Sequence, residues 1–235
     1  MDNFVWSIPT EIYFGKGQIE RLGEVAKKYG SRALIVYGGG SIKRNGIFDA
    51  ATSSLRASGV EYFELSGVEP NPRVTSVNRG AELCREHKID LLLPIGGGSS
   101  IDCAKAIAAA AFYDGDAWDL VKDRSLITKV LPIVTVLTLA ATGSEMDPVG
   151  VISNMDTNEK RSIGHPAMCP RASIMDPSYT FTVNAWHTAA GTADIMSHAM
   201  ENYFSPKKGI PSGPHDRGCA QDLCGIRHTR DTRSQ

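Results

Sequence analysis

The stretch of sequence that decides the fold is LLLPIGGGSSIDCAKAIAAAAF, which covers residues 91–112. Its first part, Leu91 to Ile95, is an apolar run that predicts a buried strand, and residues 101–112 carry the apolar spacing of a helix. Between them stand three glycines and two serines, Gly96 to Ser100. A strand that ends in glycines and opens a helix leaves free backbone N–H groups at the positive end of the helix dipole, where a diphosphate can bind. This stretch therefore predicts a nucleotide-binding protein.

A second glycine run follows a second apolar strand. Residues 33–37, ALIVY, form a continuous apolar run that is followed by Gly38, Gly39, Gly40 and Ser41. Because each run can bring the backbone close to a phosphate or a ribose, two runs are more informative than one. Neither run has the usual G-x-G-x-x-G pattern, so a pair of tight strand-to-helix turns without a ligand remains the alternative interpretation.

The first half of the chain alternates strand and helix patterns, which predicts an α/β fold with a Rossmann-like, largely parallel sheet covered on both faces. From Val183 to Phe204 the pattern is helical, so we expect a domain boundary near Thr180, with an α/β domain over residues 1–180 and the start of an all-helical domain over residues 181–204. Helices are expected at 18–28, 47–58 and 74–87, further strands at 62–65, 132–137 and 172–175, and a hairpin at 149–153 and 160–163.

Composition limits the classes of partner. The chain has 235 residues, 42% of them hydrophobic, and a formal net charge of -1, which gives no electrostatic case for nucleic acid or an anionic membrane. Small molecules are therefore the expected partners. No apolar run is long enough to span a bilayer, and residues 1–9 lack the pattern of a signal peptide, so a cytoplasmic location is expected. The 5 scattered cysteines do not resemble a disulfide framework.

One pair of side chains in the helical segment has the spacing of metal ligands. Asp194 and His198 lie four residues apart, so both project from one face of the helix. A carboxylate with an imidazole suits a divalent transition metal such as iron or zinc, although a solvated helix contact is the alternative interpretation. His87, His165 and His187 have no comparable partner in the sequence.

Residues 205–235 differ in composition and in hydrophobic pattern from the rest of the chain. Their few large aliphatic side chains follow no helical or strand period, so this segment is expected to be disordered. An alternative interpretation is a zinc-dependent interaction tail, although its spacing fits no common zinc pattern. The residues of that pattern are His215, Cys219, Cys224 and His228.

Several motifs together give the sequence a resemblance to the iron-containing (group III) alcohol dehydrogenases, nearest their butanol dehydrogenase and aldehyde reductase branch. The motifs occur in order along the chain as far as about Phe204. They are the Phe14 to Gly17 turn, YGGGSIKRNG from Tyr37, EPNP from Glu69, GGGSSIDCAK from Gly96, TLAATGSE from Thr138, DPSYT from Asp176 and the Asp194/His198 pair.

The resemblance implies a sheet domain that holds a dinucleotide and a helical domain that holds a divalent metal, iron or zinc, in a protein that forms homo-oligomers at full length. The metal would polarise the oxygen of an alcohol or aldehyde during hydride transfer, so no side chain need be a nucleophile. By similarity, the residues near the adenosine ribose are Gly38, Gly39 and Ser41, and the cleft is lined by Asn71. The diphosphate would be wrapped by Gly97, Gly98 and Ser99, and the remaining pocket would be lined by Asp102, Thr138, Ser144, Lys160 and Tyr179. The first two metal ligands would be Asp194 and His198.

The function that follows is an NAD(P)- and metal-dependent alcohol dehydrogenase that acts on a primary alcohol such as butanol, or on its aldehyde. A nucleotide-binding module without catalysis is the alternative. We expect a preference for NADPH, because residues 38–41 carry no acidic side chain and leave room for a 2′-phosphate.

The family pattern requires two further histidines from a long helical region, and His215 and His228 of this chain match no family motif. With only two ligands, this chain is expected to have little or no activity. Read from Pro211 in a frame displaced by one nucleotide, the permitted codons allow LQDRMTEGVLKTCVEY, an amphipathic helix pattern similar to the family's continuation. The hypothesis is a one-nucleotide insertion, or an equivalent shift, at or shortly before Ile210.

Overall fold

The computed structural model describes residues 8–204, and its centre is a parallel sheet of six strands in the order β1-β8-β5-β4-β2-β3. Every neighbouring pair in this sheet is parallel, whereas β6 and β7 form a separate antiparallel hairpin. The expected α/β fold with a Rossmann-like parallel sheet is confirmed. The strands are β1 (Glu11–Phe14), β2 (Arg32–Val36), β3 (Glu61–Leu65), β4 (Leu91–Gly96), β5 (Val134–Leu137), β6 (Val149–Asn154), β7 (Glu159–Gly164) and β8 (Ala172–Met175).

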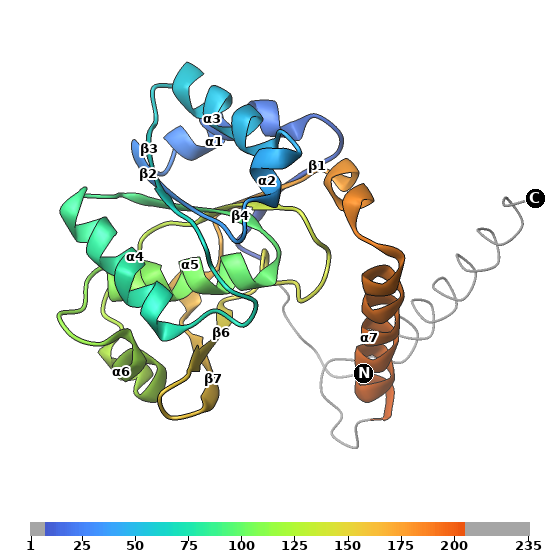
Figure 1. Cartoon of the computed structure of the whole chain (residues 1–235). Coiled ribbons are helices and arrows are strands. Elements are labelled where there is room, and N and C mark those ends of the chain that lie inside the picture. The colour runs from blue at the N-terminus through green and yellow to red at the C-terminus, as the bar shows by residue number, and fades with distance from the viewer. Residues whose placement is uncertain (1–7, 205–235) are drawn as a thin grey trace, which may run out of the picture. The chain divides into compact units, whose positions relative to one another are not determined.

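Helices cover both faces of the sheet, with α1, α2 and α3 on one side and α4 and α5 on the other (Figure 1). Neighbouring strand residues point to opposite faces, so Leu34 and Val36 join one buried apolar cluster while Ala33 and Ile35 join the other. Burial on both faces explains the continuous apolar runs of β2 and β4. The helices are α1 (Leu22–Lys27), α2 (Ser41–Arg44), α3 (Ile47–Ala57), α4 (Val74–Glu86), α5 (Gly98–Ala110), α6 (Ala117–Lys122) and α7 (Ala185–Phe204).

The order of the strands reverses between β2 and β4. The chain passes from β2 to β3 on one side, and then crosses to place β4 on the other side of β2. The two strands pair in register up to Val36 and Pro94, so their carboxyl ends lie next to each other. Ligands of open α/β sheets bind at such a switch point. Both glycine runs of the sequence follow the strands that form it.

The start of α5 differs from the prediction. We expected this helix from residue 101, whereas it begins at Gly98, and the N–H groups of Ser100 and Ile101 donate to the Gly97 oxygen at 3.1 and 3.3 Å. The expected start was wrong. Glycine disfavours a helix interior by about 1 kcal/mol, so the glycine and serine residues before Ile101 did not indicate a helix. At Gly98 a close approach requires glycine, since an added Cβ would lie 2.7 Å from the Thr142 hydroxyl oxygen.

Three short elements were not expected from the sequence, namely β1, α2 and α6. β1 has four residues, three of them exposed, and it is held by pairing with β8, in which Glu11 lies opposite Ala172. α6 has six residues and is capped by Asp116, which accepts a hydrogen bond from the Trp118 N–H. Such elements depend on partners that are distant in sequence, or on a single cap, so a periodicity argument does not detect them.

The chain divides into two compact units, and the break falls between Phe181 and Thr182. Residues 8–181 contain the sheet and its covering helices, and α7 belongs to the second unit. No helix within residues 8–204 is both long enough and apolar enough to cross a membrane. Residues 205–235, with their expected disorder, the zinc pattern and the hypothesis of a shifted frame, lie outside the described residues.

Candidate dinucleotide site and metal ligands

The first glycine run forms a cradle at the N-terminus of α5. Gly97 is the N-cap in an extended conformation, Gly98 and Ser99 are the first two helical residues, and no side chain caps the helix. The first N–H groups of a helix have no partner within it, so those of this turn can bind an anion. Leu139 lies against Gly97, where an added Cβ would be 3.3 Å from the Leu139 Cβ. Gly97, Gly98 and Ser99 are partly exposed, and the two glycines add no side chain of their own to the turn, so the cradle fits a diphosphate.

The second glycine run follows β2. At Gly38 an added Cβ would lie 3.2 Å from the Val68 oxygen, whereas Gly39 faces open space with no atom within 4 Å. Gly40 has a φ of 84°, a left-handed conformation that favours glycine, and Ser41 is exposed at the start of α2. The turn offers a small, open surface beside the α5 cradle.

Three predicted site residues from distant segments meet beside the cradle. The Lys160 ammonium, from the hairpin strand β7, donates to the Asn71 side-chain oxygen at 2.7 Å. The Asn71 N–H lies 3.4 Å from the Ser99 hydroxyl oxygen at the start of α5. Asn71 has a φ of 55°, which asparagine tolerates better than most residues. These contacts bring an amide and a cation to the same edge of the sheet as the two turns.

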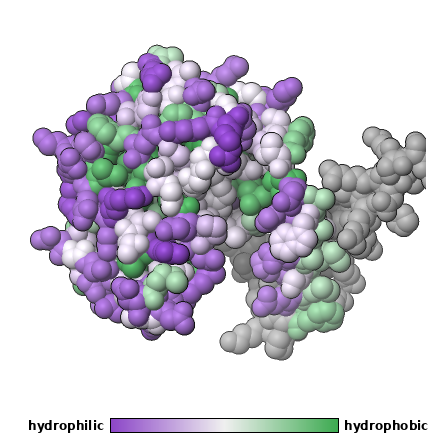
Figure 2. Space-filling model, in the orientation of Figure 1, coloured by the Kyte–Doolittle hydropathy of each residue, from purple (hydrophilic) through white to green (hydrophobic). Residues whose placement is uncertain are grey.

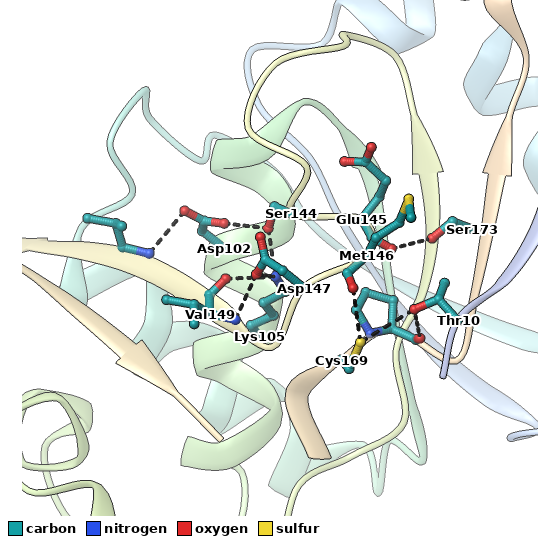
Figure 3. Close-up of polar contacts among 12 residues, drawn as sticks. Thr10, Asp102, Lys105, Ser144, Glu145, Met146, Asp147, Val149, Cys169 and Ser173 are labelled. Carbon is teal, nitrogen blue, oxygen red and sulfur yellow. Dashed lines mark hydrogen bonds and ion pairs between the residues drawn. The ribbon is translucent and has the colours of Figure 1, made fainter. Parts of the chain in front are cut away.

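A largely buried polar network joins α5 to the chain just before β6 (Figure 3). The Asp102 carboxylate accepts hydrogen bonds from the Ser144 hydroxyl at 2.6 Å and from the Val151 N–H at 3.0 Å. Burial raises the pKa of Asp102, against the opposing effect of these hydrogen bonds. Lys105, which is fully buried, donates to Ser144 at 2.8 Å and to Asp147 at 2.9 Å. The predicted residues Asp102 and Ser144 are thus in direct contact.

Lys105 and Asp147 belong to this network but were not among the predicted site residues. The signal for Lys105 was present, since it is a lysine within the apolar stretch of α5. A lysine is almost never fully buried unless its charge is paired, so its position alone indicates a polar partner. Which residue serves as the partner could not be read from the sequence, because Asp147 is 42 positions away.

Hydrogen bonds hold the segment between β5 and β6 near both of its ends. Thr138 donates its N–H to the Gly96 oxygen at 3.0 Å. Further along, the Cys169 thiol donates to the Met146 oxygen at 3.3 Å, and the Ser173 hydroxyl donates to the Glu145 oxygen at 2.7 Å (Figure 3). Together with the Lys105 network, these bonds hold residues 138–149 against the cradle.

The last predicted residue of the pocket, Tyr179, follows β8 in the short 3₁₀ helix η4 (Pro177–Thr182). It lies at the carboxyl end of the parallel sheet, the edge that carries both glycine turns, and packs against one of the two apolar clusters. Burial raises the pKa of Tyr179 to about 12, with a further contribution from Asp176. Tyr179 is therefore a neutral phenol at physiological pH.

The predicted metal ligands lie on α7. His198 Nε2 is 3.8 Å from Asp194 Oδ1, and the two side chains are 65% and 60% exposed. Within residues 8–204 no group of three or more His, Cys, Asp or Glu side chains could hold a metal ion. The donor types fit a divalent transition metal, and a complete site needs further ligands.

A parallel sheet covered on both faces, with glycine turns at its switch point, defines a Rossmann-like α/β protein. The particular family follows from comparison with known sequences. The chain belongs to the iron-containing alcohol dehydrogenases, whose family model matches residues 9–177. The resemblance given by the sequence motifs is therefore confirmed.

Individual relatives are similar over most of this chain. It is 64% identical over 209 residues to the NADH-dependent butanol dehydrogenase A of Clostridium acetobutylicum, covering 89% of this chain and 54% of that protein. It is 39% identical over 208 residues to the NADPH-dependent aldehyde reductase YqhD of Escherichia coli, covering 87% of this chain and 53% of that protein. The crystal structure of the NADH-dependent butanol dehydrogenase A of Thermotoga maritima superposes with a TM-score of 0.90 at 41% identity, covering 97% of this chain and 58% of that one.

Two facts follow from these comparisons. The chain spans about half the length of the relatives that it matches. In addition, the expected preference for NADPH finds no support, because the relative at 64% identity is named for NADH, whereas the aldehyde reductase named for NADPH is 39% identical.

Proposed function

We propose that residues 8–181 bind a nicotinamide dinucleotide, with NADH preferred, in a protein that interconverts primary alcohols such as butanol with their aldehydes. The observation that carries the proposal is the pair of glycine turns at the adjacent ends of β2 and β4, one of which opens α5 without a side-chain cap. The names of the relatives from Clostridium acetobutylicum and Thermotoga maritima support the choice of cofactor and substrate.

The residues have separate roles in this proposal. The N–H groups of Gly97, Gly98 and Ser99 bind the diphosphate, and Gly38, Gly39 and Ser41 face the adenosine ribose. Asn71 and Lys160, which are joined at 2.7 Å, orient the cofactor beside the cradle together with Thr138 and Tyr179, while Asp102 and Ser144 support them from below. When bound, the nicotinamide carries the hydride and a divalent metal polarises the alcohol oxygen.

Asp194 and His198 would hold that metal, iron or zinc, but two donors do not complete a site. We therefore propose that the 235-residue chain alone binds cofactor without ordinary rates of alcohol oxidation. Joining residues 1–204 to the corresponding helical region of the Clostridium acetobutylicum relative should restore metal-dependent oxidation of butanol. Ordinary turnover by the chain alone would contradict this proposal, and binding without restored turnover would favour a nucleotide-binding module.

The cradle itself is tested by a charge at Ser99. Ser99→Asp places a carboxylate in the first turn of α5, where it interacts favourably with the helix dipole and so does not destabilise the fold. The same charge repels a diphosphate, so we expect NADH to bind at least about tenfold more weakly, as measured by calorimetry. Ser99→Ala is the matched control and should change affinity by less than about threefold. Equal affinity of the aspartate variant and the wild type would place the diphosphate elsewhere.

A further inference from the structure

The turn after β2 carries no acidic residue, but an acid approaches it from the neighbouring strand. Glu64 lies in β3 opposite Ile35 of β2, next to the last pair of these strands. Its carboxylate accepts a hydrogen bond at 2.7 Å from the hydroxyl of Tyr37, which directly precedes the glycine run. This charge cannot be recognised from residues 38–41 alone, because Glu64 is 27 positions away from Tyr37.

The same carboxylate holds a lysine. Lys43, in α2, places its ammonium 2.8 Å from Glu64 Oε2. The ammonium also lies 4.5 Å from the centre of the Phe48 ring and 5.3 Å from that of Tyr37, so two aromatic faces help to fix its position. The hydrogen bond that Lys43 donates to Glu64 raises the pKa of Lys43, which is therefore charged at physiological pH.

Glu64 is charged as well. Partial burial acts to raise its pKa, but hydrogen bonds from Lys43 and Tyr37 outweigh that effect and lower it. The positive charge of Lys43 is thus offset locally by a carboxylate. Arg44 is the other cation at this turn, with its Nη1 atom 3.9 Å from the position of a Cβ added at Gly40.

The two cofactors differ only at the adenosine ribose, where NADPH carries a phosphate of charge about -2 and NADH carries a hydroxyl. A free lysine at this turn would attract the extra phosphate, whereas a lysine paired with a carboxylate attracts it little, and the carboxylate repels it. We propose that Glu64 is a specificity-determining residue that shifts the cofactor preference toward NADH by pairing with Lys43. This inference rests on the proposed function, in which residues 38–41 receive the adenosine ribose.

The test is the ratio of the dissociation constants of NADPH and NADH, measured by calorimetry on the full chain. In Glu64→Gln the ratio should fall about five- to tenfold, because one negative charge near the 2′-phosphate is removed and Lys43 is released. In Lys43→Gln the ratio should rise, because Glu64 then remains without its counterion. High salt should reduce both effects. A general loss of stability would weaken the binding of both cofactors alike and would leave the ratio of their dissociation constants unchanged.

Glu61→Gln is the matched control, since Glu61 lies in the same strand at its opposite end and pairs with Arg32 at 3.0 Å. It should leave the ratio unchanged. The proposal is overturned if wild type binds NADH and Glu64→Gln leaves the ratio unchanged, or if Glu61→Gln moves it equally. If wild type binds neither cofactor, the proposed function fails and this proposal fails with it, so the two failures are distinguishable.

Discussion

At the scale of single residues, Lys105 explains how a loop is fixed over the cradle. Its ammonium is fully buried and donates to Ser144, Asp147 and the Val149 oxygen, at 2.8, 2.9 and 2.7 Å. Ser144 and Asp147 belong to the segment between β5 and β6, and Val149 is the first residue of β6. A buried charge of this kind is tolerated only because several acceptors replace its water. Lys105 therefore joins α5 to the segment that covers the N-terminus of the same helix.

We expect Lys105→Met to lower the free energy of unfolding by about 2–4 kcal/mol, because it leaves the acceptors without their donor. It should also weaken NADH binding, since residues 138–149 are released from the cradle. Urea denaturation and calorimetry measure the two effects. Arg85→Met is the control, because Arg85 donates to the Ala110 and Tyr113 oxygens at the opposite end of α5. It should reduce stability and leave NADH affinity unchanged, and equal losses of affinity in both variants would contradict this role of Lys105.

The candidate site was predictable where local sequence determines local structure. The cradle of Gly97, Gly98 and Ser99 could be located because a strand, a glycine run and a helix are contiguous in the chain. Lys105 and Glu64 could not be assigned, because their partners lie 39 and 21 positions away and meet them only in the folded sheet. The expected preference for NADPH, which finds no support in the relatives, considered only the charges within the turn.

At the scale of elements, a single carboxylate joins the edge of the sheet to the chain that follows β8. Asp176 accepts hydrogen bonds from the Ser178 N–H at 2.9 Å and from the Gly17 N–H at 2.7 Å. Its two oxygens thus hold η4 to the turn after β1. Partial burial acts to raise the pKa of Asp176, but the hydrogen bonds outweigh that effect and lower it.

We expect Asp176→Ala to lower the free energy of unfolding at neutral pH by about 1–2 kcal/mol, as for the loss of a helix cap. Because the pKa in the folded state is lower than in the unfolded state, the carboxylate stabilises the fold above its unfolded pKa of about 3.9. This contribution is lost as the pH falls through the folded pKa. Urea denaturation of both proteins from about pH 7 down to pH 3 should therefore give converging stabilities.

Asp123→Ala provides the comparison for that experiment. Asp123 accepts from the Ser125 N–H at 2.9 Å and from its hydroxyl at 2.6 Å, which repeats the local pattern of Asp176 on an exposed turn. Neither of these hydrogen bonds reaches a second element. The loss of Asp123 should therefore lower the free energy of unfolding less than the loss of Asp176 does. A larger loss in Asp123→Ala than in Asp176→Ala would mean that the bond to Gly17 contributes nothing.

The elements that the sequence predicted are those with a strong period. α3, α4 and the buried strands were expected because their apolar residues recur at regular spacing, and tertiary contacts only adjusted their ends. The early start of α5 and the existence of β1 were not expected. β1 depends on its long-range pairing with β8, and the first turn of α5 consists of glycine and serine, which carry no apolar period.

At the scale of the whole molecule, the apolar core belongs to one of the two units. Both buried clusters consist of residues within 8–181, from η1 (Gln18–Arg21) to the end of the sheet. α7 contributes no residue to them, and its Trp186 and Phe204 are 72% and 73% exposed. Figure 2 shows hydrophobic as well as hydrophilic residues on the surface of this helix. The two apolar clusters therefore belong to the sheet unit alone.

We therefore expect the chain to keep its folded sheet unit when residues 182–235 are deleted. The midpoint of thermal unfolding should change by less than about 2 °C, because a unit with its own core can fold alone. NADH affinity should also stay within about twofold, since both glycine turns are retained. Trp118, which is buried in one of the two clusters, reports the transition by fluorescence. The soluble fraction should rise, because exposed apolar side chains such as Trp186 and Phe204 are removed. Loss of a cooperative transition, or a much lower midpoint, would show instead that the sheet unit depends on contacts with the deleted residues.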